Sequence, residues 1–172
     1  MRTISSLVAA ATSDEIVRIG SYPYGAQVLE VEIDPETGAT EIQRYAAIDD
    51  VGRAINPLIL HGQTHGGIAQ GIGQDMLEHC VFDDNGQALA GSFMDYAMPR
   101  ADDFPTFNIG HVCTPCTHNP LGTKGCGEAG AIGSPPALMN AVLDALSAVG
   151  VKDLDMPASP NRVWQAIQSA RH

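Results

Sequence analysis

The sequence has few basic residues and no long apolar run, and each absence excludes a class of protein. Lysine and arginine number nine against twenty aspartates and glutamates, a formal net charge of −11. Without a basic stripe to neutralise phosphates, nucleic acid is not an expected partner. No segment approaches the roughly 20 apolar residues of a membrane-spanning helix. The apolar stretch from Leu7 to Ala11 is also shorter than a signal-peptide core, so we expect a cytoplasmic protein.

What remains is the composition of a globular domain. Charged residues make up 17% of the 172 residues and hydrophobic residues 44%, which predicts a folded chain with a core of its own. The four cysteines include a C-x-x-C pair, Cys113 and Cys116, with His111 and His118 nearby. A small zinc site is therefore one hypothesis, although a second pair at ligand spacing is missing and ordinary reduced thiols are favoured.

The first half of the chain predicts a hairpin followed by a helix. Residues 28–33 alternate polar with apolar side chains, DPETG supplies a turn, and residues 40–48 return as a second strand. A helical spacing of apolar residues begins near Gln63 or Thr64 and continues through Ile68 and Ile72. Glycine recurs along this helix at a cost of about 1 kcal/mol each, which indicates close packing against backbone or ligand.

The second half predicts further short elements. DDNG in VFDDNGQALAGSF indicates a second hairpin, and a strand is expected over 107–112. Ser134, followed by Pro135 and Pro136, has the pattern of a helix start, and this helix should end between 146 and 149. A last helix is expected over 160–170, capped by Ser159. The fold class is α+β: antiparallel hairpins and a mixed sheet with a glycine-rich helix and two C-terminal helices.

One segment, KGCGEAGAIG at 124–133, contains a single carboxylate, Glu128, among four glycines. Glycine accumulates where backbone must approach something closely or take φ values that other residues avoid. A glutamate aimed at a reacting atom in a tight pocket would need such surroundings. From glycine content alone, a loop that merely turns is an equally good interpretation.

Several blocks in order resemble one protein family. They are YGAQVLEVEIDPETG, IDDVGRAINPLILHGQTHGGIAQGIGQ, GSFMDYAMPRADDFP, TPCTHNPLGTKGCGEAGAIG and PPALMNAVLDAL. Together they resemble the C-terminal part of the molybdopterin-binding large subunit of the xanthine oxidase family, within it the aerobic carbon monoxide dehydrogenase branch. The match covers residues 21–172 and leaves 1–20 as a poorly matched N-terminal segment.

The resemblance implies a chemistry. In this family the glutamate of the KGxGE motif is the catalytic base that activates molybdenum-bound hydroxide for attack on an electrophilic carbon, and Glu128 occupies its position. The implied cofactor is a molybdenum-pyranopterin, in the form of molybdopterin cytosine dinucleotide, and no protein side chain is expected to ligate the metal. The residues expected to contact the cofactor are Gln63, Lys124, Gly125, Cys126 and Gly127. Lys124 is equally consistent with a surface cation paired to an acidic residue.

The resemblance also implies that the chain acts with other polypeptides. The family's large subunit is several times longer, and its other cofactor-contacting loops have no counterpart here. Expected partners are the rest of the molybdenum subunit, iron-sulfur and flavin subunits and a small-molecule substrate, with self-association as a further route to cover exposed surface. We expect the isolated chain to be inactive and not to retain the cofactor. The alternative is a non-catalytic interaction or assembly domain derived from such a subunit; the substrate cannot be read from these residues.

Overall fold

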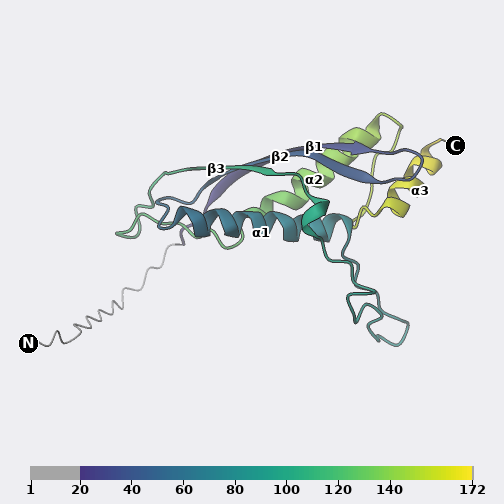
Figure 1. The fold of residues 1–172 in the computed structure, drawn as a ribbon, viewed down its shortest axis with the longest axis horizontal. Helices are drawn as coiled ribbons and strands as arrows, with labels where there is room; N and C mark the ends of the chain where they lie inside the picture. Colours follow the sequence, from purple (N-terminus) through teal and green to yellow (C-terminus); the bar gives the residue numbers. More distant parts are fainter. Residues whose placement is uncertain (1–19, 172) are drawn as a thin grey trace, which may run out of the picture.

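The computed structural model describes residues 20–171 as a small mixed sheet packed with helices (Figure 1), which confirms the α+β class. In chain order the elements are β1 (Tyr24–Ile33), β2 (Thr40–Asp50), α1 (Pro57–Met76), the 3-10 helix η1 (Ala101–Asp103), β3 (Phe107–Val112), α2 (Ala129–Ser147) and α3 (Pro160–Ala170). The sheet order is β1-β2-β3; β1 pairs antiparallel with β2, and β3 pairs parallel with it.

The first hairpin forms as its alternation predicts. The turn is fixed by Asp34, whose carboxylate accepts from the amide of Glu36 and the hydroxyl of Thr37. Gly38 closes the turn at φ 73°, in the left-handed region that glycine reaches without strain. The strand over 107–112 and the helix over 160–170 are also confirmed, although the side chain of Ser159, at the N-cap position, makes no capping hydrogen bond.

The glycine-rich helix begins earlier than predicted. It starts at Pro57, because the Asn56 side chain accepts from the amides of Leu58 and Ile59 at 3.1 and 3.4 Å as a helix N-cap. Asparagine followed by proline at the first helical position is a start signal, which the expected start near Gln63 overlooked. Leu58 and Ile59 are exposed, so the first turn lacks the buried stripe on which the prediction relied.

The start of α2 was also predicted wrongly. The helix begins at Ala129, directly after Glu128, and encloses Pro135 and Pro136. Ser134 does not cap it; this buried side chain donates a hydrogen bond to the carbonyl of Ile68 on α1, at 3.3 Å. The glycine segment is therefore partly the first turns of a helix.

The second predicted hairpin forms only in a minimal version. Between α1 and η1 the chain turns at Gly86 and pairs through an isolated antiparallel bridge from Phe82 to Ala88, with the Leu89 amide donating to the Val81 carbonyl, but it forms no named strand. In Figure 1 this stretch extends away from the packed helices and sheet. Its residues are almost all exposed, so no apolar face exists to stabilise a ladder.

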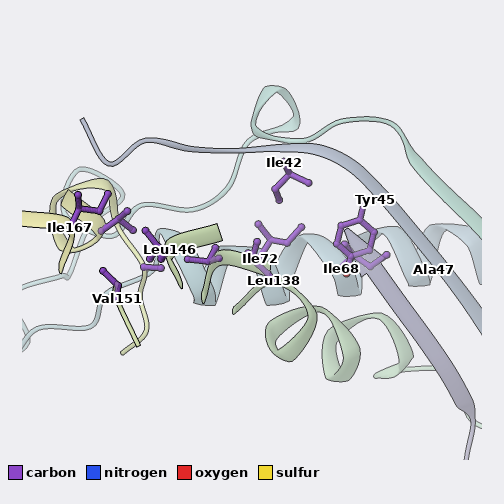
Figure 2. Packing of buried hydrophobic residues seen from close by; sticks show 12 residues of the cluster. Ile42, Tyr45, Ala47, Ile68, Ile72, Leu138, Leu146, Val151 and Ile167 are labelled. Carbon is purple, nitrogen blue, oxygen red and sulfur yellow. The ribbon is translucent and has the colours of Figure 1, made fainter. Parts of the chain in front are cut away.

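Glycines bring α1 and α2 into contact. A Cβ at Gly67 would lie 2.9 Å from the amide nitrogen of Ala131, and one at Gly130 would lie 2.5 Å from the carbonyl oxygen of Thr64. Only glycine permits the two backbones to approach this closely. Beyond the crossing, buried side chains of α1, α2, α3 and β2 form one core (Figure 2), which includes Ile68, Ile72, Leu138, Val142, Leu146, Val163, Ile167, Ile42 and Tyr45.

One buried group stands out in this core. Asp75, near the end of α1, is fully buried, and neither carboxylate oxygen has a hydrogen-bond partner among residues 20–171. Burial raises the pKa of Asp75 to about 7.

No helix in the described part of the chain is long and apolar enough to span a bilayer.

Candidate functional site

The segment before α2 is anchored at its first residue, Lys124. The Lys124 ammonium lies 3.1 Å from Oδ2 of Asp50, at the end of β2, and both side chains are largely buried. The Lys124 amide also donates to the carbonyl of Val51. Lys124 is therefore paired with an acidic residue, as one interpretation of the sequence had it, but in the interior and not on the surface.

Asp50 organises the surroundings of this ion pair. Its Oδ1 accepts from the amides of Gly52 at 2.9 Å and Thr114 at 3.0 Å. These bonds, first those from Thr114, hold the pKa of the carboxyl well below its usual range. Asp50 is thus an anion at neutral pH that joins β2, the loop after β3 and the KGCGE segment.

The other end of the segment is tied to α1 by Gln63. Its Nε2 donates to the carbonyl oxygen of Gly127 at 2.6 Å. Gln63 is exposed, and this bond uses only one of the groups on a side-chain amide that offers two N–H donors and an oxygen acceptor. Gln63 can hold the loop and still present polar atoms to a ligand.

A pocket of about 420 Å³ lies between the start of α1 and this loop. It brings together four of the predicted residues: Gln63, Lys124, Cys126 and Gly127. Gly125 and Glu128 do not line it, although each is adjacent in sequence to a residue that does. The remaining wall is mostly apolar and comes from residues 51–60 and Thr123.

Glu128 lies at the junction of loop and helix. It is the N-cap residue of α2, with φ −110° and ψ 0°, and its side chain makes no capping hydrogen bond. The side chain is exposed. A carboxylate at a helix N-terminus is favoured by the helix dipole. Because the Glu128 carboxylate makes no capping hydrogen bond, its oxygens are free to accept a proton.

The glycines around Glu128 divide into two groups. Gly130 and Gly133 approach other parts of the chain, α1 and the Gln27 side chain respectively. A Cβ at Gly127 would meet nothing within 4 Å, and one at Gly125 would only reach ordinary contact with the Ser21 carbonyl at 3.9 Å. The four glycines therefore do not cage Glu128 from all sides; two of them pack the helix and two lie beside open space.

The thiols behave differently from one another. Burial, with a smaller effect from Asp49, raises the pKa of the Cys126 thiol, so it is protonated at neutral pH. Hydrogen bonds, first from Ser21, lower the pKa of Cys116. Among residues 20–171 no group of three or more His, Cys, Asp or Glu side chains could hold a metal ion, and the zinc hypothesis for Cys113 and Cys116 gains no support.

Two residues at this site were not predicted from the sequence. Asp50 was not, because its partners at 114 and 124 lie far along the chain. Gln27 was not either, although its side chain donates hydrogen bonds to the first turn of α2. The available signal for Gln27 was its place as a polar residue on a strand with a buried face, because a half-buried side-chain amide needs hydrogen-bond partners.

Comparison with known families identifies the domain. The family model described as a molybdopterin cofactor-binding domain matches residues 9–105, more than half of the chain. The chain belongs to this family. Within it, the chain is 41% identical over 148 residues to the carbon monoxide dehydrogenase large chain of Hydrogenophaga pseudoflava, and 42% identical over 144 residues to the nicotine 6-hydroxylase large subunit of Paenarthrobacter nicotinovorans.

Solved structures of the family agree with this assignment. The Cu,Mo-CO dehydrogenase in its carbon monoxide reduced state superposes with a TM-score of 0.83 at 35% identity, over 87% of this chain and 19% of that one. Quinoline 2-oxidoreductase from Pseudomonas putida 86 gives a TM-score of 0.77 at 43% identity, over 80% of this chain and 18% of that one. The molybdopterin-binding fold is therefore shared with molybdenum oxidoreductases that differ in substrate.

The match covers a small part of those relatives. The alignments take in 86% and 84% of this chain but only 18% of each of the two curated large subunits. This domain thus corresponds to about a fifth of a xanthine oxidase-family large subunit, which confirms the resemblance seen in the sequence.

The pocket suits an edge of the family's cofactor. Gly127 lines it without positive φ and without a neighbour that a Cβ would touch, so nothing within residues 20–171 requires glycine there. A bulky ligand passing over the loop would require it. The amide of Gln63, backbone groups of the loop and an apolar wall are suitable neighbours for a pterin.

Proposed function

We propose that this chain is a catalytic part of a molybdenum hydroxylase and that Glu128 is its general base. The observation that supports the proposal best is the Gln63 to Gly127 hydrogen bond, which joins α1 to the KGCGE segment beside the pocket. Four of the residues that the sequence assigned to the cofactor meet there, with Glu128 one residue further along. The proposed cofactor is a molybdenum-pyranopterin in its cytosine dinucleotide form.

The residues of the chain divide the work as follows. Gln63 and the backbone of Cys126 and Gly127, which line the pocket, would hold one edge of the cofactor, with Gly125 beside them in the same loop, and the buried Lys124 fixes the start of the loop through Asp50. When bound, the molybdenum-pyranopterin supplies the redox chemistry. Glu128 accepts the proton at a carboxylate oxygen as an oxygen nucleophile attacks an electrophilic substrate carbon, which requires the base to come within about 3 Å of the proton donor.

We propose that further polypeptide completes the site. Apolar side chains that line the pocket are exposed, with Ile55 at 69% and Ile59 at 68%. A patch of this kind marks a surface that another part of a protein covers. The proposed partners are the rest of the large subunit and, with it, iron-sulfur and flavin subunits in the cytoplasm. The isolated chain is expected to bind no molybdenum, and near-stoichiometric metal in it would contradict this.

Replacement of the base tests the proposal. The assembled enzyme, purified through a tag on this chain, would be assayed on carbon monoxide, an aldehyde, a purine and an N-heterocycle with a dye as electron acceptor. Glu128→Gln should lose at least a hundredfold in kcat on the active substrate while molybdenum content stays at the wild-type level. Glu36→Gln, in the exposed hairpin turn, is the control. Full turnover in Glu128→Gln would instead favour a non-catalytic assembly domain.

A further inference from the structure

The side-chain amide of Gln27 joins β1 to the first turn of α2. Its Nε2 donates to the carbonyl oxygens of Ala129 at 3.2 Å and Gly130 at 3.1 Å. Its Oε1 accepts a hydrogen bond from the hydroxyl of Tyr45 on β2. The amide therefore uses both its donor and its acceptor end, and the two ends are not interchangeable.

Tyr45 sets that orientation. Its side chain is 2% exposed and its ring packs on Phe107, with centroids 5.1 Å apart. Burial, before any other cause, raises the pKa of Tyr45 above its ordinary value, so the phenol is a donor at neutral pH. Because Tyr45 donates, the oxygen of the Gln27 amide must face β2 and the nitrogen must face α2.

The helix leaves room for this amide. A Cβ at Gly133 would lie 2.5 Å from Nε2 of Gln27 and 2.7 Å from its Cδ. The backbone of Gly133 has no positive φ, so the close approach of Gln27 and not conformational freedom accounts for glycine here.

The first turn of α2 also depends on outside support more than a usual helix start. Pro135 and Pro136 lie inside the helix and carry no N–H. The carbonyls four residues earlier, at Ala131 and Ile132, therefore lack their helical donors. With fewer bonds connecting it to the next turn, the segment that begins at Ala129 is held by its neighbours on β1 and α1.

Two glutamine amides thus hold the backbone on either side of Glu128. Gln63 bonds the carbonyl before it, at Gly127, and Gln27 bonds the carbonyl after it, at Ala129. Since the Glu128 side chain makes no capping bond, the position of its carboxylate depends on where the backbone holds this residue. We propose that Gln27 is a positioning residue for Glu128, with Tyr45 orienting its amide. The inference rests on the proposed function of Glu128.

Hydrogen exchange in the full chain tests the structural part. Gln27→Met keeps the length of the side chain and removes its hydrogen bonds. Exchange of the Ile132 amide, which donates to the Glu128 carbonyl at 2.9 Å, should become about tenfold faster, and amides of α3 should not change. Tyr45→Phe keeps the ring and should give a smaller increase at the same amide, which provides a second test if Gln27→Met folds poorly. Gln43→Met, exposed on β2, is the matched control.

Two exchange results would overturn the inference. One is wild-type protection of the Ile132 amide in both variants. The other is an equal increase in α3, which would indicate a general loss of stability and no specific hold on the start of α2.

Kinetics of the assembled enzyme separate this inference from the proposed function. Gln27→Met should lower kcat about tenfold with KM within twofold and molybdenum content unchanged, and Gln43→Met should match the wild type. If Glu128→Gln is inactive but Gln27→Met has full kcat, the inference fails and the proposed function stands. If Glu128→Gln has full kcat, the proposed function fails, and the positioning role fails with it.

Discussion

The glycines at the crossing of α1 and α2 differ sharply from those of the KGCGE loop. At the helix crossing, Gly67 and Gly130 face backbone of the opposite helix at distances that exclude any Cβ. In the loop, Gly127 faces open space beside the pocket. Contacts within the fold explain why Gly67 and Gly130 are glycines, whereas no contact within the described residues explains why Gly127 is one. We propose that the cofactor passes over Gly127, because this glycine, unlike the equally open Gly66 and Gly91, lines the pocket.

The largest effect on stability is expected at the crossing. Gly130→Ala would place a Cβ 2.5 Å from the Thr64 carbonyl oxygen and 2.9 Å from the Ile68 amide nitrogen. Because both atoms belong to backbone, relief requires the helices to separate, at a cost of about 3 kcal/mol in the free energy of unfolding. Urea denaturation of the chain measures this. A variant as stable as the wild type would show that the crossing is not closed by glycine contact.

The next largest effect on stability is expected at Asp75, whose carboxyl group is buried in the core. Its folded-state pKa of about 7 lies above the ordinary value of 3.8. The folded protein therefore binds the proton more tightly than the unfolded chain, and stability falls as pH rises from about 4 to 7. Asp75→Asn should raise the free energy of unfolding by about 1–3 kcal/mol at pH 8.

The advantage of Asp75→Asn should shrink at pH 5, where the wild-type carboxyl is protonated in the folded state. Asp144→Asn, exposed on α2, should show no such dependence. A destabilised Asp75→Asn at pH 8 would mean that the carboxylate has a favourable partner.

A smaller effect, of opposite sign, is expected at Gly66, beside Gly67 on α1. A Cβ at Gly66 meets nothing within 4 Å, and alanine is favoured over glycine in a helix by about 1 kcal/mol. Gly66→Ala should therefore stabilise the chain by about 1 kcal/mol in the same urea titration. Destabilisation would mean that the two faces of α1 do not differ as described.

Much of this fold follows from local patterns in the sequence. The first hairpin, β3 and α3 were predicted because alternation, turn residues and the proline at the first position of α3 are signals within a few positions. The two helix starts were not. The predicted start of α1 near Gln63 or Thr64 missed Asn56 as the N-cap and Pro57 as the first helical residue, and Pro135 was taken as a first position although α2 begins at Ala129. In α2, contacts with α1 and β1 override the local preference of proline.

The candidate site was predictable in part. Of the residues that the resemblance assigned, four line the pocket, whereas Gly125 and Glu128 do not, and glycine content identified the loop. The buried pairing of Lys124 with Asp50 and the bonds of Gln27 depend on strand register and helix packing. No local spacing contains that information, so only the folded structure revealed them.

The molybdenum content of Gly127→Ala tests the central claim, that the open glycine faces the cofactor. In the chain, this change should leave the free energy of unfolding within about 0.5 kcal/mol of the wild type, since no described atom is displaced. Gly91→Ala, at an exposed glycine equally free of neighbours in the stretch before η1, is the matched control. In the assembled enzyme, we expect molybdenum per protein to fall at least tenfold in Gly127→Ala and to stay at the wild-type level in Gly91→Ala. Full molybdenum occupancy in Gly127→Ala would contradict the account.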